Sequence, residues 1–524
     1  MNSRHPQPGT GSSARRPLLL IPPDDPRRAR PKPLGLTNFG GPVEMIGLNV
    51  ADARYHLEVL GLTGVGKSWW MTQYVIAEAL AGRGVVLIDC QGDLVRNILD
   101  RLPPSCADRL VVLDPDDLLE GGAIPAFNPL APDPAIPGGG GEWAAEHLTG
   151  TLRQLYASSW GDRMDDLMRC TALTLTHRPD STLPDVVRML TDTPFRANLL
   201  ATVALPDWLA SFWDDYDELT AAQRGSLYAP LVSRLRGVLS RRFARALLGS
   251  PVTTFSLTEI LDGGILLARL PKGELGEDAS RLISGLLLAG CWGHTTRRSR
   301  RAPEDRPDAT VIVDEAQNTL NLPIGVDLAL AESRGYRVSW MIAHQHDAQL
   351  DASVREAIDA NCRNKIYFLL SARDAPRKAH HINPYLAEHD LSSRGGFQMV
   401  ARVVHEGQEQ PPFTLDSPPL PEPIPGRAEW LRARARARTG VTDAERADTH
   451  DQRERDRRTD RSVLRGEPTG GQVTPPGGDA PSGGPANPRP TPAASSPTRH
   501  GRADTGRGGR RPERRNPPDR RRRP

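Results

Sequence analysis

Gly61-Leu62-Thr63-Gly64-Val65-Gly66-Lys67-Ser68 is the most informative segment of this sequence for its fold class. An alternating run, 55–60, precedes it and a helical pattern from Lys67 to about residue 81 follows it, so a strand leads into the loop and a helix leaves it. Glycines let the backbone curl so that successive N–H groups point to one place, and the helix N-terminus adds partial positive charge. The sequence therefore predicts a phosphate-binding loop for ATP.

Each residue type in the loop has an expected task. Lys67 is expected to contact the β- and γ-phosphates, and the Ser68 hydroxyl to bind Mg²⁺. Backbone groups of the other loop residues are expected to surround the phosphates. The predicted nucleotide contacts are Gly61, Thr63, Gly64, Val65, Gly66, Lys67 and Ser68.

Two carboxylates follow another apolar run. Val311-Ile312-Val313 is followed by Asp314 and Glu315, and open α/β sheets bind ligands at the edge where strands end in this way. Asp314 is expected to hold Mg²⁺, directly or through water, and Glu315 to polarise the attacking water as general base. Two acids after a strand are also compatible with an ordinary solvated strand end. Their combination with the glycine-rich loop favours hydrolysis over simple nucleotide binding.

Strand and helix patterns alternate on both sides of a purely helical block. Apolar runs typical of buried parallel strands occur at 55–60, 85–89, 110–114, 265–270, 310–314, 337–343 and 366–370. Only helical periodicity occurs from Trp143 to about residue 249. We therefore predict an α/β fold: a RecA-like P-loop domain with a mostly parallel sheet, an inserted all-α domain and disordered tails. The expected parts are a basic N-terminal tail (1–34), the nucleotide-binding domain in two pieces (35–130 and 256–420), the all-α insert (131–255), and an Arg/Pro-rich, mostly disordered C-terminal tail (421–524) in which an Arg/Ala-rich stretch, 430–438, is compatible with a helix.

The charge of the chain is unevenly distributed. Its net charge is +3, but residues 1–34 carry +5 and residues 501–524 carry +7, which leaves −9 on residues 35–500. The central part therefore shows no global basic surface of the kind that marks a nucleic-acid-coating protein. Any DNA contact is expected to use a local basic patch, a pore or the tails. The run Arg520–Arg523 suits nonspecific phosphate binding, although composition alone also produces such tails, since 62 of the 67 basic residues are Arg.

Cysteine usage and hydropathy indicate the compartment. The five cysteines are scattered without metal-type spacing, as expected of free thiols in a reducing cytosol. No apolar run approaches the roughly 18–20 residues that span a bilayer, and no signal peptide is recognisable. We expect a cytoplasmic protein without an intrinsic transmembrane segment, which reaches the inner face of the membrane only through partners.

Gln345 and Arg334 are two further polar residues that are interpretable only together with the glycine-rich loop and the acidic pair. Gln345 ends the run 337–343 and is placed to sense the γ-phosphate or orient water, although a strand-end Gln is usually just solvated. Arg334 precedes the same strand and suits an arginine finger that reaches across a subunit boundary. An ordinary helix-terminal Arg, favoured by the helix dipole, is the alternative.

The order of motifs resembles that of the conjugative coupling proteins, the type IV secretion DNA-transfer ATPases related to the HerA/FtsK translocases. The resemblance covers roughly residues 40–415. It rests on an ordered series: Gly61–Ser68, Ile88–Leu94, Phe127-Asn128-Pro129-Leu130, Trp160-Gly161-Asp162-Arg163, Leu270-Pro271-Lys272-Gly273, Asp314–Gln317 and His344-Gln345. Many members carry N-terminal transmembrane helices, where this chain has a short basic tail, and members often have Pro after the strand-two Asp, where this chain has Cys90.

The resemblance implies a hexameric ring with ATP at the subunit interfaces and DNA in the central channel. By position, Lys67 and Ser68 match the Walker A residues, Asp314 and Glu315 the Walker B pair, Gln345 the sensor and Arg334 the arginine supplied in trans. The implied catalytic residues are thus Glu315, Gln345 and Arg334, and the implied Mg²⁺ ligands are Ser68 and Asp314.

The resulting hypothesis is a DNA-dependent ATPase that recruits and moves relaxase-bound DNA during conjugation, with type IV secretion channel proteins as partners. One alternative is a HerA/FtsK-like DNA pump in repair or segregation. An alternative of another class is a nucleotide-switched adaptor that binds substrate proteins through its helical insert and does not translocate DNA. Trp160, Phe212 and Trp213 in the insert are expected to be core residues, or else part of a surface for an accessory DNA-binding factor.

Overall fold

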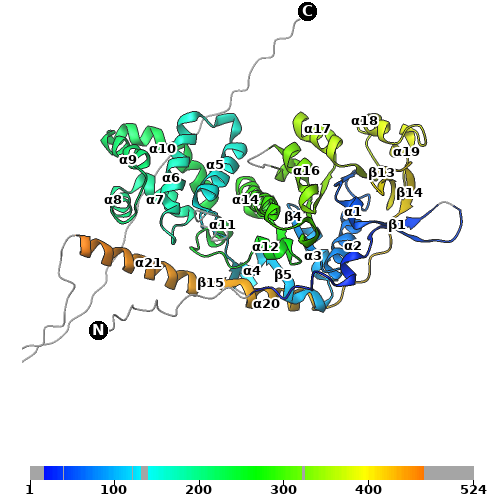
Figure 1. The fold of residues 1–524 in the computed structure, drawn as a ribbon, viewed down its shortest axis with the longest axis horizontal. Helices are drawn as coiled ribbons and strands as arrows, with labels where there is room; N and C mark the ends of the chain where they lie inside the picture. The colour runs from blue at the N-terminus through cyan, green and yellow to red at the C-terminus, as the bar shows by residue number, and fades with distance from the viewer. Residues whose placement is uncertain (1–16, 39, 121, 132–139, 321–324, 465–524) are drawn as a thin grey trace, which may run out of the picture. The chain divides into compact units, whose positions relative to one another are not determined.

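A mostly parallel sheet organises the chain (Figure 1). The computed structural model describes residues 17–38, 40–120, 122–131, 140–320 and 325–464. The sheet has eleven strands in the order β2-β1-β14-β11-β10-β3-β9-β8-β4-β7-β5. Their bounds, in that order, are Met45–Leu48, Lys32–Thr37, Phe413–Asp416, Gln398–Arg402, Asn364–Tyr367, Leu57–Leu60, Val338–His344, Ala309–Val313, Gly84–Asp89, Ile265–Arg269 and Leu110–Leu113.

The seven strands from β10 to β5 are parallel, and they are the seven apolar runs that the sequence predicts. Their alignment brings the ends of β3, β9, β8 and β4 to one edge, since Leu60 pairs with His344 and Val313 with Ile342. The strands β2, β1, β14 and β11 extend the sheet in antiparallel pairs beyond β10. The sequence pattern did not predict this extension.

Each face of the parallel part is covered by its own hydrophobic core. Successive residues of β4 point alternately into the two cores. Val86 and Ile88 belong to one core, and Val85 and Leu87 belong to the other, as the two-residue period of a strand requires. The first face is covered by α12 (Leu257–Leu261), α14 (Glu277–Thr296), α16 (Val326–Ser333) and α17 (Ala352–Asn361). The second is covered by α2 (Lys67–Leu80) and α3 (Asp93–Leu99). The chain therefore has the two-sided α/β architecture that the alternating pattern predicts.

The segment between β6 (Ala123–Pro125) and α12 contains helices and no strand within its described residues, 126–131 and 140–256. The helices are α5 (Gly141–Leu155), α6 (Asp162–Thr176), α7 (Leu183–Thr191), α8 (Thr193–Thr202), α9 (Asp207–Glu218), α10 (Ala221–Leu239) and α11 (Arg242–Leu248). Trp213 is buried and its Nε1 donates to Thr174 Oγ1 at 2.7 Å, and Trp160 and Phe212 pack partly buried against the same core. The core interpretation of these aromatic residues is confirmed.

The N-terminal segment is more ordered than its composition predicts. We expected residues 1–34 to be a disordered tail, but within them the structure has a 3₁₀ helix at Pro26–Ala29 and the start of β1 at Lys32. The Lys32 side chain is buried and its Nζ lies 2.8 Å from a carboxylate oxygen of Glu78 on α2. This partner lies 46 positions away in the chain, so local composition could not indicate it. Residues 1–16 lie outside the described part.

The C-terminal segment also departs from expectation. Residues after 421 were expected to be mostly disordered apart from a helix near 430–438, which α20 (Arg427–Thr439) confirms, but β15 (Gly440–Thr442) and α21 (Asp443–Leu464) follow that helix. We call residues 427–464 the C-terminal strap. The start of the strap, α20, packs on β5, β15 pairs with β6, and α21 reaches the insert, where Arg453 contacts Asp185 at 2.5 Å (Figure 1). The prediction for Arg520–Arg523 falls outside the described residues.

One strap residue shows why this segment is ordered. The Arg432 guanidinium, almost fully buried, forms ion pairs with Asp114 and, at 3.2 Å, with Asp117. Burial alone would lower the pKa of Arg432, but the two carboxylates raise it above its ordinary value. Both aspartates are buried as well, so the strap supplies charges that the nucleotide domain needs. The arginine-rich α20 is therefore held on the nucleotide domain by tertiary ion pairs.

Short elements complete the described chain. They are α1 (Val50–Ala53), α4 (Asp116–Glu120), α13 (Lys272–Leu275), α15 (Ala316–Thr319), α18 (Ala375–Lys378), α19 (Glu388–Ser392), β12 (Val404–His405) and β13 (Gln408–Glu409). All five cysteines are buried free thiols, as expected. Among the described helices, none combines the length and the hydropathy needed to cross a bilayer.

Candidate nucleotide-binding site

The predicted phosphate loop lies between β3 and α2, at the edge of the sheet where the parallel strands end. Gly64 and Gly66 have φ of 81° and 104°, a left-handed conformation that glycine adopts without strain. At Gly61 a Cβ would come within 2.6 Å of the Phe368 Cβ. These three glycines are thus required by backbone conformation or by space.

Lys67, the first residue of α2, is folded back onto the loop. Its Nζ donates to the Gly61 carbonyl at 2.5 Å and to the Leu62 carbonyl at 2.8 Å. Burial lowers the pKa of this ammonium, against the attraction of Asp314 and Glu315. The ammonium therefore lies at the loop in a partly desolvated setting, where an anionic ligand gains more from it than it would in water.

The two predicted carboxylates lie beside the loop, directly after β8. The Asp314 N–H donates to the Ile88 carbonyl at the end of β4, at 3.0 Å. Glu315 adopts a left-handed backbone conformation, with φ of 53°, which is uncommon for a non-glycine residue. This backbone reversal separates the directions of two consecutive carboxylates, so they can serve different tasks.

Asp314 sits in an excess of negative charge. Burial, and then the neighbouring Asp89 and Glu315, raise its pKa to about 7, and Lys67 offsets only part of this effect. Asp89 is engaged elsewhere, because its carboxylate accepts the N–H groups of Gln91, Gly92 and Val95 at 2.7–3.0 Å. A divalent cation at Asp314 would relieve the excess charge, and carboxylate and hydroxyl oxygens are the donors that Mg²⁺ prefers. The donor set at Asp314 and the exposed Ser68 fits that ion.

Three glutamine amides hold Glu315. Gln345 and Gln91 donate through Nε2 to its Oε1, the latter at 2.6 Å, and Gln317 donates to its Oε2 at 2.5 Å. Gln345 also accepts a hydrogen bond from Thr63 Oγ1 at 2.8 Å, so it links the phosphate loop to the acidic pair. The structure thus brings together the predicted Thr63, Gln345 and Glu315. Gln91 and Gln317 were not predicted as site residues. The only indication in the sequence was that each lies two positions after a strand-end acid, Asp89 or Glu315.

Phe397 is a residue of the site that sequence reasoning missed. It precedes β11, and its N–H donates to the Val65 carbonyl at 2.9 Å. Its ring lies against Gly66, where an added Cβ would come within 2.7 Å of Phe397 Cδ1. Phe397 is more than 300 positions from the loop in the sequence, so only the paired strands of the sheet bring it there.

Arg334 lies apart from this cluster. It follows α16 and precedes β9 at its amino end, whereas Gln345 follows the carboxyl end of β9. The seven residues of β9 separate the two by about 20 Å at the usual rise of a strand. The Arg334 guanidinium lies 3.8 Å from the Tyr55 ring centroid, and its Nη2 donates to the Tyr55 hydroxyl at 2.7 Å. Arg334 therefore does not reach the phosphate loop of its own chain.

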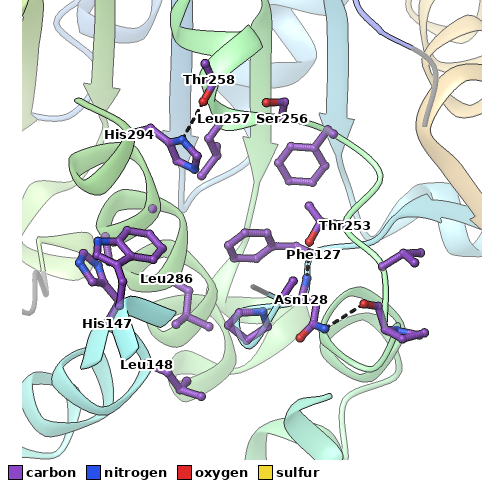
Figure 2. A pocket seen from close by; sticks show the side chains of 18 of the residues that line it. Phe127, Asn128, His147, Leu148, Thr253, Ser256, Leu257, Thr258, Leu286 and His294 are labelled. Atoms are coloured by element: carbon purple, nitrogen blue, oxygen red, sulfur yellow. Dashed lines mark hydrogen bonds between the residues drawn. The ribbon is translucent and has the colours of Figure 1, made fainter. Parts of the chain in front are cut away.

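A cavity of about 790 Å³ lies at the base of the insert (Figure 2). Its wall contains the stacked rings of Phe127 and Phe255. The Asn128 side chain donates to the carbonyls of Ser181 and Pro251 at 2.8 and 3.0 Å, and its N–H donates to Thr253 Oγ1. Asn128 thus fastens the point where the chain leaves the nucleotide domain to the point where it returns. None of the predicted site residues lines this cavity. The cavity lies where the insert is attached to the nucleotide domain.

Comparison with known proteins identifies the fold. No protein-family model matches the chain, and no curated protein matches its sequence. The plasmid coupling protein TrwB in complex with a non-hydrolysable GTP analogue is similar in structure, with a TM-score of 0.50 and 14% identity over 80% of this chain and 98% of that one. TrwB with a non-hydrolysable ATP analogue gives 0.51 and 15% over 79% and 97%. VirB4 of Thermoanaerobacter pseudethanolicus gives 0.48 and 16% over 75% and 97%. The chain therefore has the RecA-like P-loop fold of the conjugative coupling protein TrwB, as the resemblance of its motifs predicts.

Proposed function

We propose that this protein is an ATP-hydrolysing motor that moves DNA, acting as the coupling ATPase of a conjugative transfer system. The observation that carries the proposal is the convergence of Lys67, Asp314, Glu315 and Gln345 at one edge of a TrwB-like sheet. A nucleotide-binding fold alone would need the lysine and the loop. The acidic pair and its linked glutamine are the additional parts that hydrolysis needs.

The loop receives the phosphates of ATP in this proposal. They lie against the N–H groups at the start of α2, and Lys67 exchanges the Gly61 and Leu62 carbonyls for phosphate oxygens. Ser68 and Asp314 would hold Mg²⁺, which neutralises charge on the phosphates when it is bound. Binding requires Asp314 to be ionised, so a raised pKa near 7 couples cation binding to release of a proton.

Glu315 takes the proton of the attacking water in this mechanism. Gln91, Gln317 and Gln345 keep its carboxylate in one orientation, and preorganisation of this kind lowers the reorganisation needed at the moment of reaction. Because Gln345 also contacts Thr63, a movement of the phosphate loop reaches the catalytic carboxylate directly. This link makes Gln345 the proposed sensor of the γ-phosphate.

Arg334 serves the nucleotide of a neighbouring subunit in the proposed hexameric ring. Three observations support action in trans: Arg334 is far from its own phosphate loop, its side chain is exposed, and its guanidinium packs on the Tyr55 ring. ATP at each interface would then be held by Lys67 of one subunit and approached by Arg334 of the next. Closing and opening of the interfaces would drive DNA through the central channel. Relaxase-bound DNA and channel proteins of a type IV secretion system are the proposed partners.

Steady-state ATP hydrolysis with and without DNA tests the proposal. Wild type is expected to hydrolyse ATP slowly alone and several-fold faster with DNA. Lys67→Ala is expected to abolish nucleotide binding and turnover, whereas Glu315→Gln is expected to retain binding and lose turnover. An unchanged rate with single- and double-stranded DNA would favour the nucleotide-switched adaptor and refute the motor. Electron microscopy with an ATP analogue and DNA tests the ring, and persistent monomers would contradict the trans role of Arg334.

A further inference from the structure

Two large aromatic side chains are exposed beside the phosphate loop. Trp69, two residues after Lys67, is 37% exposed, and Phe397 is 44% exposed. Their ring centroids are 5.8 Å apart at an interplanar angle of 67°. Most tryptophans of α2 and the sheet are buried, as Trp70 and Trp340 are. An exposed aromatic pair at the entrance of a ligand site therefore calls for a function.

The backbone holds Phe397 in this place against its own preference. Its φ is 65°, and a bulky residue in the left-handed region is destabilised by about 1–2 kcal/mol. Two backbone hydrogen bonds compensate: its N–H donates to the Val65 carbonyl at 2.9 Å, and its carbonyl accepts the Ser417 N–H at 2.7 Å. Strained backbone of this kind concentrates at ligand sites. Glycine would adopt this conformation without strain, so the phenylalanine ring is present here at a cost in backbone stability.

The pair lies beside the N–H groups that would bind the phosphates of a nucleotide. The N–H groups of Lys67, Ser68 and Trp69 precede that of Trp70, which donates to the Gly66 carbonyl at 3.0 Å. Trp69 itself carries the last of these three N–H groups, so its side chain is within reach of the rest of a nucleotide whose phosphates bind there. The Phe397 ring covers the same helix start through Gly66.

We propose that Trp69 and Phe397 form a stacking subsite for the base of the bound nucleotide. The inference rests on the proposed nucleotide site and adds its base specificity. Stacking recognises the π-face of a base and not its hydrogen-bonding edge. The subsite therefore favours the large purine rings over pyrimidines and distinguishes adenine little from guanine.

Isothermal titration calorimetry with ATP, GTP, CTP and inorganic tripolyphosphate tests the subsite, because tripolyphosphate has phosphates and no base. Wild type is expected to bind ATP and GTP with similar affinity, CTP several-fold more weakly and tripolyphosphate more weakly than ATP. Trp69→Ala and Phe397→Ala are each expected to weaken ATP and GTP about tenfold and to leave tripolyphosphate unchanged. Trp69→Phe keeps a ring and is expected to restore ATP binding to within about threefold.

Controls separate this inference from the proposed function. Trp208→Ala, on α9 and 57% exposed, is the matched control and should bind every ligand as wild type does. Loss of both ATP and tripolyphosphate in Lys67→Ala supports the phosphate site whatever the aromatic variants show. Equal weakening of ATP and tripolyphosphate in Trp69→Ala would assign the ring a structural role and overturn the subsite, as would equal affinity of wild type for ATP and CTP. Failure of wild type to bind any of the four ligands would refute the nucleotide site together with the subsite.

Discussion

Replacement of Asp314 by asparagine is expected to stabilise the protein while it disables the site. Burial with Asp89 and Glu315 raises the pKa of Asp314 to about 7, whereas an unfolded chain has a value near 3.9. The folded protein therefore holds this proton more tightly. The stability linked to it is complete below pH about 4 and is lost progressively as the pH rises to about 7. Asparagine carries no charge and can still accept the Glu315 N–H, which donates to Asp314 Oδ1 at 3.0 Å.

The magnitude follows from about 1.36 kcal/mol per pKa unit. The titration of Asp314 destabilises the free protein by about 4 kcal/mol at pH 8, where both states are ionised, and by about 1.5 kcal/mol at pH 5, where only the unfolded chain is ionised. Asp314→Asn should therefore gain about 2.5 kcal/mol more stability at pH 8 than at pH 5. With an unfolding entropy of about 2.1 cal/mol/K per residue and on the order of 450 folded residues, this difference corresponds to about 2–3 °C in Tm.

Thermal unfolding of wild type and Asp314→Asn, without nucleotide or Mg²⁺, at pH 5 and pH 8 measures this difference. Asp93→Asn removes a carboxylate that is 80% exposed at the start of α3 and should change Tm little at either pH. In addition, titration of each protein with ATP, with and without Mg²⁺, should show that Mg²⁺ raises the ATP affinity of wild type but not that of Asp314→Asn. A gain in Tm that is equal at the two pH values, or a loss of Tm at pH 8, would refute the charge-excess argument and with it the fit of the site to a cation.

Three further substitutions test other links. Gln345→Ala should leave ATP affinity within about threefold and lower turnover by at least tenfold, measured by parallel binding and hydrolysis assays; a large loss of affinity would contradict its role as sensor. Arg334→Ala should be inactive alone but regain partial turnover when mixed with Lys67→Ala, because mixed rings contain interfaces with both residues intact; absence of any regain would argue against action in trans. Arg432→Ala removes one of the two arginines that pair with each of the buried Asp114 and Asp117 and should destabilise the protein by about 1.5–3 kcal/mol in denaturant unfolding, whereas Arg434→Ala, 51% exposed, should change it by less than about 1 kcal/mol.

Local patterns were sufficient for the parallel part of the fold. The apolar runs of β4, β5, β7, β8 and β9 are nearly continuous in the sequence because both faces of a parallel strand are covered, whereas β3 and β10 also bury the polar residues Glu58, Asn364 and Lys365. The antiparallel extension was not predicted. β1 begins at a Lys-Pro pair and β14 has one buried residue among four. Their place in the sheet depends on pairing between residues such as Leu36 and Asp416, which no local period encodes.

The C-terminal strap illustrates the same limit for charged segments. Arg432, Arg436 and Arg438 lie in an Arg/Ala-rich stretch that is compatible with a helix, but its sequence does not indicate what the helix packs against. Asp117, which contacts two of them, and Asp108 supply the ion pairs that hold α20 in place. A mostly basic helix is held where the fold presents carboxylates in a fixed place, and that place is a tertiary property.

The candidate phosphate loop at Gly61–Ser68 and the strand-end acids Asp314 and Glu315 can be predicted from the sequence alone, as can the parallel strands that precede them. These features are local, because a loop, a strand end and a helix start each occupy a few consecutive residues. How the candidate site is completed depends on the tertiary structure. It placed Phe397 over Gly66, gathered three glutamines on Glu315, put Arg334 at the far end of β9 and ordered the C-terminal strap. These contacts join residues from separate elements, and their energy depends on burial and charge that exist only once the sheet has formed.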